Sequence, residues 1–266
     1  MTRNELIAAI KNKQSFLCVG LDPDLKKIPS HLLDYDDPIF EFCKQIIEQT
    51  KDLAVAYKPN LAFFECLGPK GWQTLEKIKK EIPQHCFTIA DAKRGDIGNT
   101  SSMYASTFFK YYDFDAVTVA PYMGRDSIEP FLQYEGKWVI VLGLTSNPGA
   151  TDFEMLQTEK GRLYEQVIAS VASWGNDQNT MFVVGATQPA LMESVRTIVP
   201  NHFLLVPGIG AQGGDFNATC QSGINRDIGL LINSSRNILY ASAGLDFAEA
   251  ARKECMQVVA GMQAYL

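Results

Sequence analysis

The sequence predicts an α/β protein that folds as one (β/α)8 TIM-barrel domain over residues 1–266. Eight short apolar runs recur along the chain, each nearly continuous in Val, Ile, Leu, Phe or Ala, as in strands that helices cover on both faces. Amphipathic helical segments separate these runs, and alternating strands and helices imply parallel strands with right-handed crossovers. The length fits as well, because such a barrel occupies about 250 residues as a single unit.

The predicted strands follow the apolar runs in chain order. They cover residues 15–22, 53–60, 86–91, 116–122, 138–146, 181–187, 203–208 and 238–244. An open, doubly wound sheet is the alternative arrangement of such units. No G-x-G-x-x-G sequence follows the first run, which weakens a dinucleotide-binding interpretation.

The predicted helices lie between these strands. Apolar residues at helical spacing mark the segments 1–15, 38–47, 72–82, 163–171 and 191–198. The last helix begins at Asp246, with Glu249 three residues later, the spacing of a capping box. We interpret all of these apolar stripes as contacts with the core.

Composition excludes several classes of protein. The chain has 24 Lys and Arg against 30 Asp and Glu. It therefore lacks the excess of positive charge with which proteins bind the phosphate backbone of nucleic acids. Its longest apolar run is far shorter than the ~20 residues that span a bilayer, and the N-terminal stretch does not read as a signal peptide. The six cysteines form no C-x-x-C pair and read as small buried hydrophobes. We therefore expect a cytoplasmic protein that binds neither nucleic acid nor membrane.

Charged residues close the first three predicted strands, at the end where barrels place their chemistry. Asp22 ends the first strand and Lys58 the second, while Asp91 and Lys93 end the third. Alternate side chains of a strand share a face, so Asp91 and Lys93 both point toward the barrel mouth. Burying several charges is costly unless they are paired or have a use. The cluster predicts a functional site, and a structural ion-pair network is the alternative.

The loop after the seventh predicted strand is rich in glycine. Gly208, Gly210, Gly213 and Gly214 allow backbone N–H groups to approach an anion, and this loop is the usual phosphate site of such barrels. No metal site is predicted. The chain has three histidines, and His85 and His202 fall at strand starts, where we expect structural roles.

Together these motifs resemble a known family. Residues 91–97, read with Lys58-Pro-Asn60 and with residues 207–214, are similar to the orotidine 5′-phosphate decarboxylases, and residues 88–100 are similar to their longer bacterial subgroup. The Asp-x-Lys-x-x-Asp element is shared with sister sugar-phosphate decarboxylases. Lys58 favours the orotidine 5′-phosphate decarboxylases over the metal-dependent sister enzymes, because those enzymes carry an acidic metal ligand near the end of the second strand.

The resemblance implies a homodimer with a shared active site. It would convert orotidine 5′-monophosphate to uridine 5′-monophosphate and CO₂ in pyrimidine biosynthesis, without a cofactor. Lys93 would protonate C6 of the pyrimidine, and the charged array would comprise Lys58, Asp91, Lys93 and Asp96. The residues implied in substrate binding are Asp22 and Lys58 for the ribose, Ser146 for the ring, and Gly210, Gln212 and Gly213 for the phosphate. Asp96 and Thr100 would act across the dimer.

The sequence departs from the family pattern in one feature. Many members carry Gly-Arg on the eighth strand and bind phosphate with that arginine, whereas the predicted strand 238–244 contains no Arg. Arg236 is the nearest candidate, at the amino end of that strand and away from the mouth. Residues 146–160 and the glycine-rich loop are the expected lids. The alternatives are a sister sugar-phosphate decarboxylase, a Schiff-base aldolase and a non-catalytic binder of a phosphate ligand.

Overall fold

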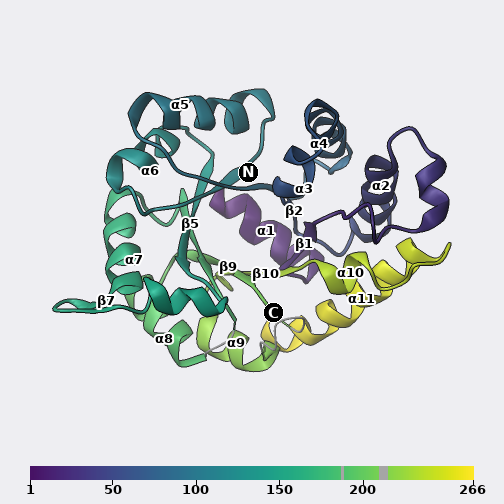
Figure 1. The fold of residues 1–266 in the computed structure, drawn as a ribbon. Coiled ribbons are helices and arrows are strands. Elements are labelled where there is room, and N and C mark those ends of the chain that lie inside the picture. Colours follow the sequence, from purple (N-terminus) through teal and green to yellow (C-terminus); the bar gives the residue numbers. More distant parts are fainter. Residues whose placement is uncertain (187–188, 210–214) are drawn as a thin grey trace. The chain divides into compact units, whose positions relative to one another are not determined.

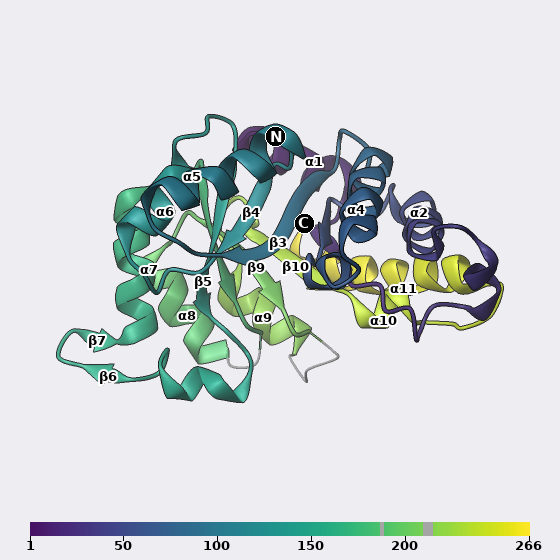
Figure 2. The ribbon, with the colours of Figure 1, turned by 45° about the horizontal axis from the view of Figure 1, so that its top comes forward.

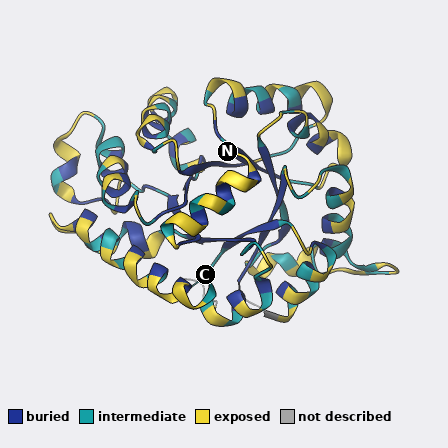
Figure 3. Cartoon of the chain, turned by 180° about the vertical axis from the view of Figure 1, so that it is seen from behind, coloured by how far each residue is buried: buried dark blue, intermediate teal, exposed yellow. Residues whose placement is uncertain are grey.

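A computed structural model of the chain describes residues 1–186, 189–209 and 215–266. Eight parallel strands form a closed barrel in the order β1-β10-β9-β8-β5-β4-β3-β2, so the predicted (β/α)8 fold class is confirmed (Figure 1). Their bounds are β1 Leu17–Leu21, β2 Ala56–Pro59, β3 Phe87–Arg94, β4 Ala116–Val119, β5 Trp138–Leu144, β8 Thr180–Val184, β9 Phe203–Pro207 and β10 Leu230–Ser234. The strands are almost wholly buried, as expected for nearly continuous apolar runs (Figure 3).

By its internal contacts the chain divides into two compact units, residues 8–92 with 234–266 and residues 1–7 with 93–233. The first unit contains β1, β2 and most of β3, with helices α2 (Pro38–Thr50), α3 (Ala62–Glu65), α4 (Pro69–Glu81), α10 (Arg236–Leu239) and α11 (Phe247–Met262). Helix α2 illustrates why these segments are helical. Pro38 occupies its first turn, the Asp37 carboxylate accepts the Phe40 N–H, and Phe42 and Ile46 are fully buried.

The second unit contains the other five strands. Its helices are α5 (Gly98–Ser106), α6 (Arg125–Leu132), α7 (Leu163–Trp174), α8 (Pro189–Ile198) and α9 (Phe216–Gly223). The short hairpin of β6 (Gln157–Thr158) and β7 (Gly161–Arg162) precedes α7 and extends away from it (Figure 2). Helix α1 (Arg3–Lys13) begins in this unit.

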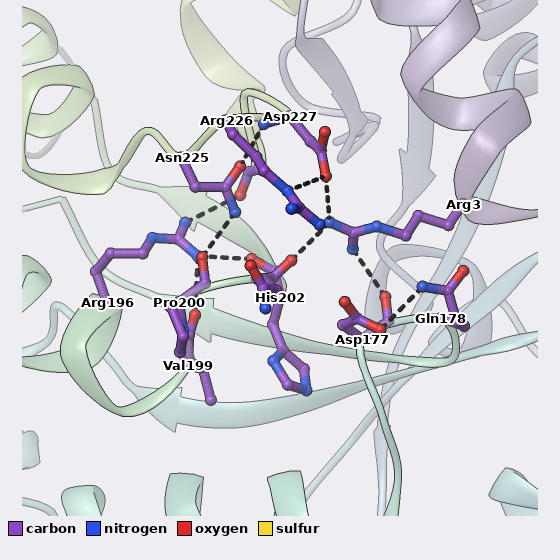
Figure 4. A network of polar contacts seen from close by, with 12 residues as sticks. Arg3, Asp177, Gln178, Arg196, Val199, Pro200, His202, Asn225, Arg226 and Asp227 are labelled. Carbon is purple, nitrogen blue, oxygen red and sulfur yellow. Dashed lines mark hydrogen bonds and ion pairs between the residues drawn. The ribbon is translucent and has the colours of Figure 1, made fainter.

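A network of arginine contacts joins the segments that precede β8, β9 and β10 in the second unit (Figure 4). The buried Arg3 donates to the carbonyls of Asp177 and Asn201 and pairs with Asp227. Arg196 donates to the His202 carbonyl at 2.7 Å. Burial lowers the pKa of His202 to about 4, so its ring is neutral at pH 7. His202 therefore packs at the start of β9, as the sequence predicts for a structural histidine.

The eighth predicted strand is wrong. Residues 230–234, not 238–244, form β10, and Arg236–Leu239 form the single helical turn α10. The apolar pair Ile238 and Leu239 is fully buried, but a buried helical turn and a buried strand look alike in a short apolar run. Helices α5, α6 and α9 had no predicted counterpart. The capping box at Asp246 is also wrong, because this carboxylate accepts the Ser242 hydroxyl at 2.6 Å instead.

Two further expectations can be compared with the structure. All six cysteines are free, and five are buried as predicted, whereas Cys66 is exposed. Among the described residues, no helix combines the length and the apolar character needed to cross a membrane.

Candidate active site

A buried ion pair joins the carboxyl ends of β2 and β3. The Lys58 Nζ lies 2.8 Å from Asp91 Oδ2, and the two side chains are only 6% and 10% exposed. Parallel pairing brings them together, since Ala56 and Tyr57 align with Phe87 and Thr88. The sequence predicted this juxtaposition from the strand ends, and the structure confirms the contact.

The charge of Lys58 is stabilised in spite of its burial. Burial alone would lower the pKa of the ammonium, but the carboxylates of Asp91 and Asp22 outweigh it and hold the pKa of Lys58 above its ordinary value. Burial raises the pKa of the neighbouring Cys18 thiol to about 12, so this thiol stays neutral. The site therefore contains a permanent ammonium between carboxylates at neutral pH.

Asp22 follows β1 and presents an unused acceptor. Its Oδ1 is buried and accepts no hydrogen bond from any residue that the structure describes. Leaving a buried carboxylate oxygen unpaired is costly, so a donor from a ligand is the natural complement. The loop that carries Asp22 is fixed by Tyr240, whose hydroxyl donates to the Asp22 carbonyl at 2.7 Å and accepts the Asp24 N–H at 2.8 Å.

Lys93 is the penultimate residue of β3, two residues after Asp91, and its side chain is exposed. Its backbone has a φ of +47°, in the left-handed region that non-glycine residues seldom occupy. The Lys93 N–H donates to Thr118 Oγ1 at 2.9 Å. The sequence predicted neither this conformation nor the contribution of Thr118.

Asp96 and Thr100 lie on the turn into α5 and in its first turn. Asp96 Oδ1 accepts the Ile97 N–H at 2.7 Å, and the Asp96 carbonyl lies 2.6 Å from Ser101 Oγ. Thr100 is exposed. Large apolar side chains around this segment and after β4 are also exposed, at 56% for Ile97, 58% for Met103, 86% for Tyr122 and 46% for Met123.

Ser146 is the second residue after β5, at the carboxyl end of the strand. Gly185 lies so close to it that a Cβ at position 185 would stand 2.7 Å from the Ser146 Cβ. Next to it, Glu154 accepts the Thr145 N–H at 2.7 Å and the Thr145 hydroxyl at 2.8 Å. These bonds tie residues 148–154 to the end of β5.

The structure describes only one part of the predicted phosphate site. Gly210, Gln212 and Gly213 lie outside the described residues. Arg236, however, follows β10 by two residues and begins α10, so it stands at the carboxyl end of a strand and not before one. The expectation that Arg236 lies away from the mouth is therefore corrected, because the strand is eight residues earlier than predicted.

The described residues also bear on metal binding. Within residues 1–186, 189–209 and 215–266, no three His, Cys, Asp or Glu side chains gather as a metal site would require. The chemistry that these residues offer is that of fixed ammonium groups, carboxylates and hydroxyls.

Comparisons with known proteins agree on one family. A model of the orotidine 5′-phosphate decarboxylase / HUMPS family matches residues 15–253. A protein of Flavobacterium johnsoniae named orotidine 5′-phosphate decarboxylase is 59% identical over 97% of this chain and 96% of its own length. One of Bacteroides fragilis with the same name is 57% identical over 97% and 96%.

Solved structures resemble this chain over nearly its whole length. The OMP decarboxylase of Leishmania donovani matches with a TM-score of 0.85 and 38% identity, covering 99% of this chain and all of the other. The UMP synthase of the same organism matches with a TM-score of 0.86 and 40% identity, covering 98% of this chain and 57% of that longer one.

Proposed function

The chain belongs to the orotidine 5′-phosphate decarboxylase / HUMPS family, and from this premise we propose that it is a carboxy-lyase converting orotidine 5′-monophosphate to uridine 5′-monophosphate and CO₂ in pyrimidine biosynthesis. The observation that carries the proposal is the buried Lys58–Asp91 pair beside an Asp22 oxygen that no described residue hydrogen-bonds. Lys58 stands where metal-dependent sister decarboxylases have an acidic ligand, which favours a reaction without metal.

In the proposed reaction Lys93 supplies both charge and proton. Breaking the bond between C6 and the carboxylate releases CO₂ and leaves an electron pair on C6 that the ring delocalises poorly. A fixed ammonium beside C6 stabilises this developing charge and then donates its proton to C6. The resulting amine regains a proton from solvent, so the cycle closes with no cofactor.

The Lys58–Asp91–Asp22 cluster is proposed to bind the sugar. The buried Asp22 Oδ1 has no hydrogen-bond donor among the described residues, and a ribose hydroxyl can donate to it. Lys58 remains charged and can donate to a second hydroxyl, while Asp91 holds its Nζ in place. Ser146, at the end of β5, is proposed to contact the pyrimidine ring.

A second copy of the chain is proposed to complete the site. Ile97 and Met103 are exposed on the segment that carries Asp96, and Tyr122 and Met123 are exposed after β4. Exposed large apolar side chains support an interaction surface when they form one patch. In the homodimer, Asp96 and Thr100 would reach the active site of the partner. The chain would thus supply Lys93 to one site and Asp96 to the other.

Arg236 is proposed to bind the substrate phosphate, together with Gly210, Gln212 and Gly213. We expect Arg236→Ala to raise KM for orotidine monophosphate roughly 10- to 100-fold, because a charge-assisted bond to phosphate contributes about 1.5–3 kcal/mol. Steady-state kinetics at fixed ionic strength measures this. The exposed Arg226 provides the control, since Arg226→Ala should leave KM unchanged. An unchanged KM in Arg236→Ala would remove Arg236 from the phosphate site.

The function itself is tested by one assay. Purified protein with orotidine monophosphate and EDTA should change the ultraviolet absorbance of the pyrimidine as its carboxylate is lost. No change with or without added divalent metal would refute the decarboxylase proposal, and turnover that requires metal would refute the cofactor-free step. Trapping of Lys58 or Lys93 by borohydride with a keto-sugar phosphate would instead indicate the aldolase.

A further inference from the structure

The backbone at Lys93 is in an unfavourable conformation. With a φ of +47°, this lysine occupies a region in which its Cβ crowds its own carbonyl, and such residues persist only where their surroundings hold them. Gly95, two residues later, could adopt this conformation without strain, yet the positive φ falls on the lysine. The strain therefore lies at the residue that the proposed function makes the proton donor.

Hydrogen bonds from the β4 side hold this end of β3, and two of them differ in kind. The Ala120 N–H donates to the Arg94 carbonyl at 2.8 Å, a backbone bond that any sequence could make. The Lys93 N–H donates at 2.9 Å to Thr118 Oγ1, a side-chain atom, so that this second bond depends on the residue at position 118. The left-handed turn of the chain at Lys93 thus directs its amide to a hydroxyl.

Thr118 carries the one polar side chain of β4. It is 1% exposed and lies in β4, whose other members are Ala116, Val117 and Val119. Valine has nearly the same shape and a higher preference for buried strands, so packing alone does not require a hydroxyl here. The hydroxyl accepts the Lys93 N–H, which the side chain of valine could not do.

We propose that Thr118 is a positioning residue for Lys93, holding the left-handed backbone that aims the Lys93 ammonium at the reacting carbon. The inference rests on the proposed decarboxylation and deepens it. Since Nζ stands at the end of a long side chain, a relaxation of φ at Lys93 displaces the ammonium much more than the backbone. A misplacement of about 1 Å can lower a rate 10²-fold.

Three variants test this inference. Thr118→Val removes the acceptor and keeps the shape, Thr118→Ser keeps the acceptor and removes a methyl group, and Thr180→Val makes the same change at a buried threonine at the start of β8. We expect Thr118→Val to lower kcat roughly 10- to 100-fold with KM within about twofold, because Lys93 acts on the transition state and not on binding. Thr118→Ser should recover kcat to within about threefold, and Thr180→Val should change neither constant.

The outcomes separate this inference from the proposed function. If the unmodified protein has no decarboxylase activity, the proposed function fails first. If it is active and Thr118→Val keeps its kcat, Thr118 does not position Lys93. Equal losses of kcat in the Val and Ser variants would assign the effect to packing of the methyl group and overturn the inference. Melting temperatures identify a variant that has lost its fold. Independently of rate, a crystal structure of Thr118→Val in which φ at Lys93 has moved away from +47° would support the inference, and an unchanged φ would oppose it.

Discussion

Lys93→Ala is expected to lose at least about 10⁴-fold in kcat/KM while the protein remains folded. General-acid catalysis contributes about 10²- to 10⁴-fold, and a preorganised charge beside the developing carbanion contributes about as much again. Fold should be retained because the Lys93 side chain is exposed and its backbone bond to Thr118 survives the substitution. Alanine is preferable to glycine here, since glycine would also release the strain at a φ of +47°.

The measurement is the ultraviolet assay at saturating substrate, together with circular dichroism and a melting curve. Lys110→Ala is a matched control, because Lys110 is an exposed lysine of the same unit that rests over the Tyr134 ring. The control should retain full activity. Residual activity above about 1% in Lys93→Ala would mean that another group protonates the product, and the role assigned to Lys93 would have to be abandoned.

The sequence predicted the ends of β1 and β2 to within one residue, whereas β3 continues to Arg94, three residues beyond its predicted end at Asp91. Lys58 and Asp91 interrupt runs that are otherwise apolar, so their neighbouring positions at the barrel mouth follow from parallel strands alone. The ion pair between them is seen only in the structure. Sequence reasoning misplaced the eighth strand because β10 has only three apolar residues before Asn233 and Ser234. The apolar run at the start of 238–244 predicts the strand instead. Burial does not distinguish the helical turn found there from a strand.

The hydroxyls of the site escaped prediction for a different reason. Thr118 and Tyr240 lie within or beside apolar runs, where threonine and tyrosine are common for reasons of packing. The role of each depends on the hydrogen-bond partner of its hydroxyl oxygen, which can be seen only in the three-dimensional structure. The lone threonine in the strand 116–119 was the available signal. The left-handed Lys93 had no signal, since lysine is not a residue that favours a positive φ.

A mixture of two inactive variants is expected to regain activity if the site is shared across the dimer. Asp96→Ala and Lys93→Ala should each be inactive as homodimers. In a heterodimer of the two, one site combines Lys93 of the first chain with Asp96 of the second and is intact, while the other site lacks both. A heterodimer purified through two different tags should therefore have about half the activity of the unmodified dimer.

The matched control places both substitutions on one chain. A heterodimer of the unmodified chain with the Lys93→Ala/Asp96→Ala double variant has the same composition, but a shared site would leave neither of its two sites complete. Sharing thus predicts about half activity for the first heterodimer and almost none for the second. If Asp96 serves the site of its own chain, the two results exchange places, because the unmodified chain then keeps one complete site. Light scattering on both preparations establishes that each is a dimer, so a lack of activity in the first heterodimer would refute the shared site directly.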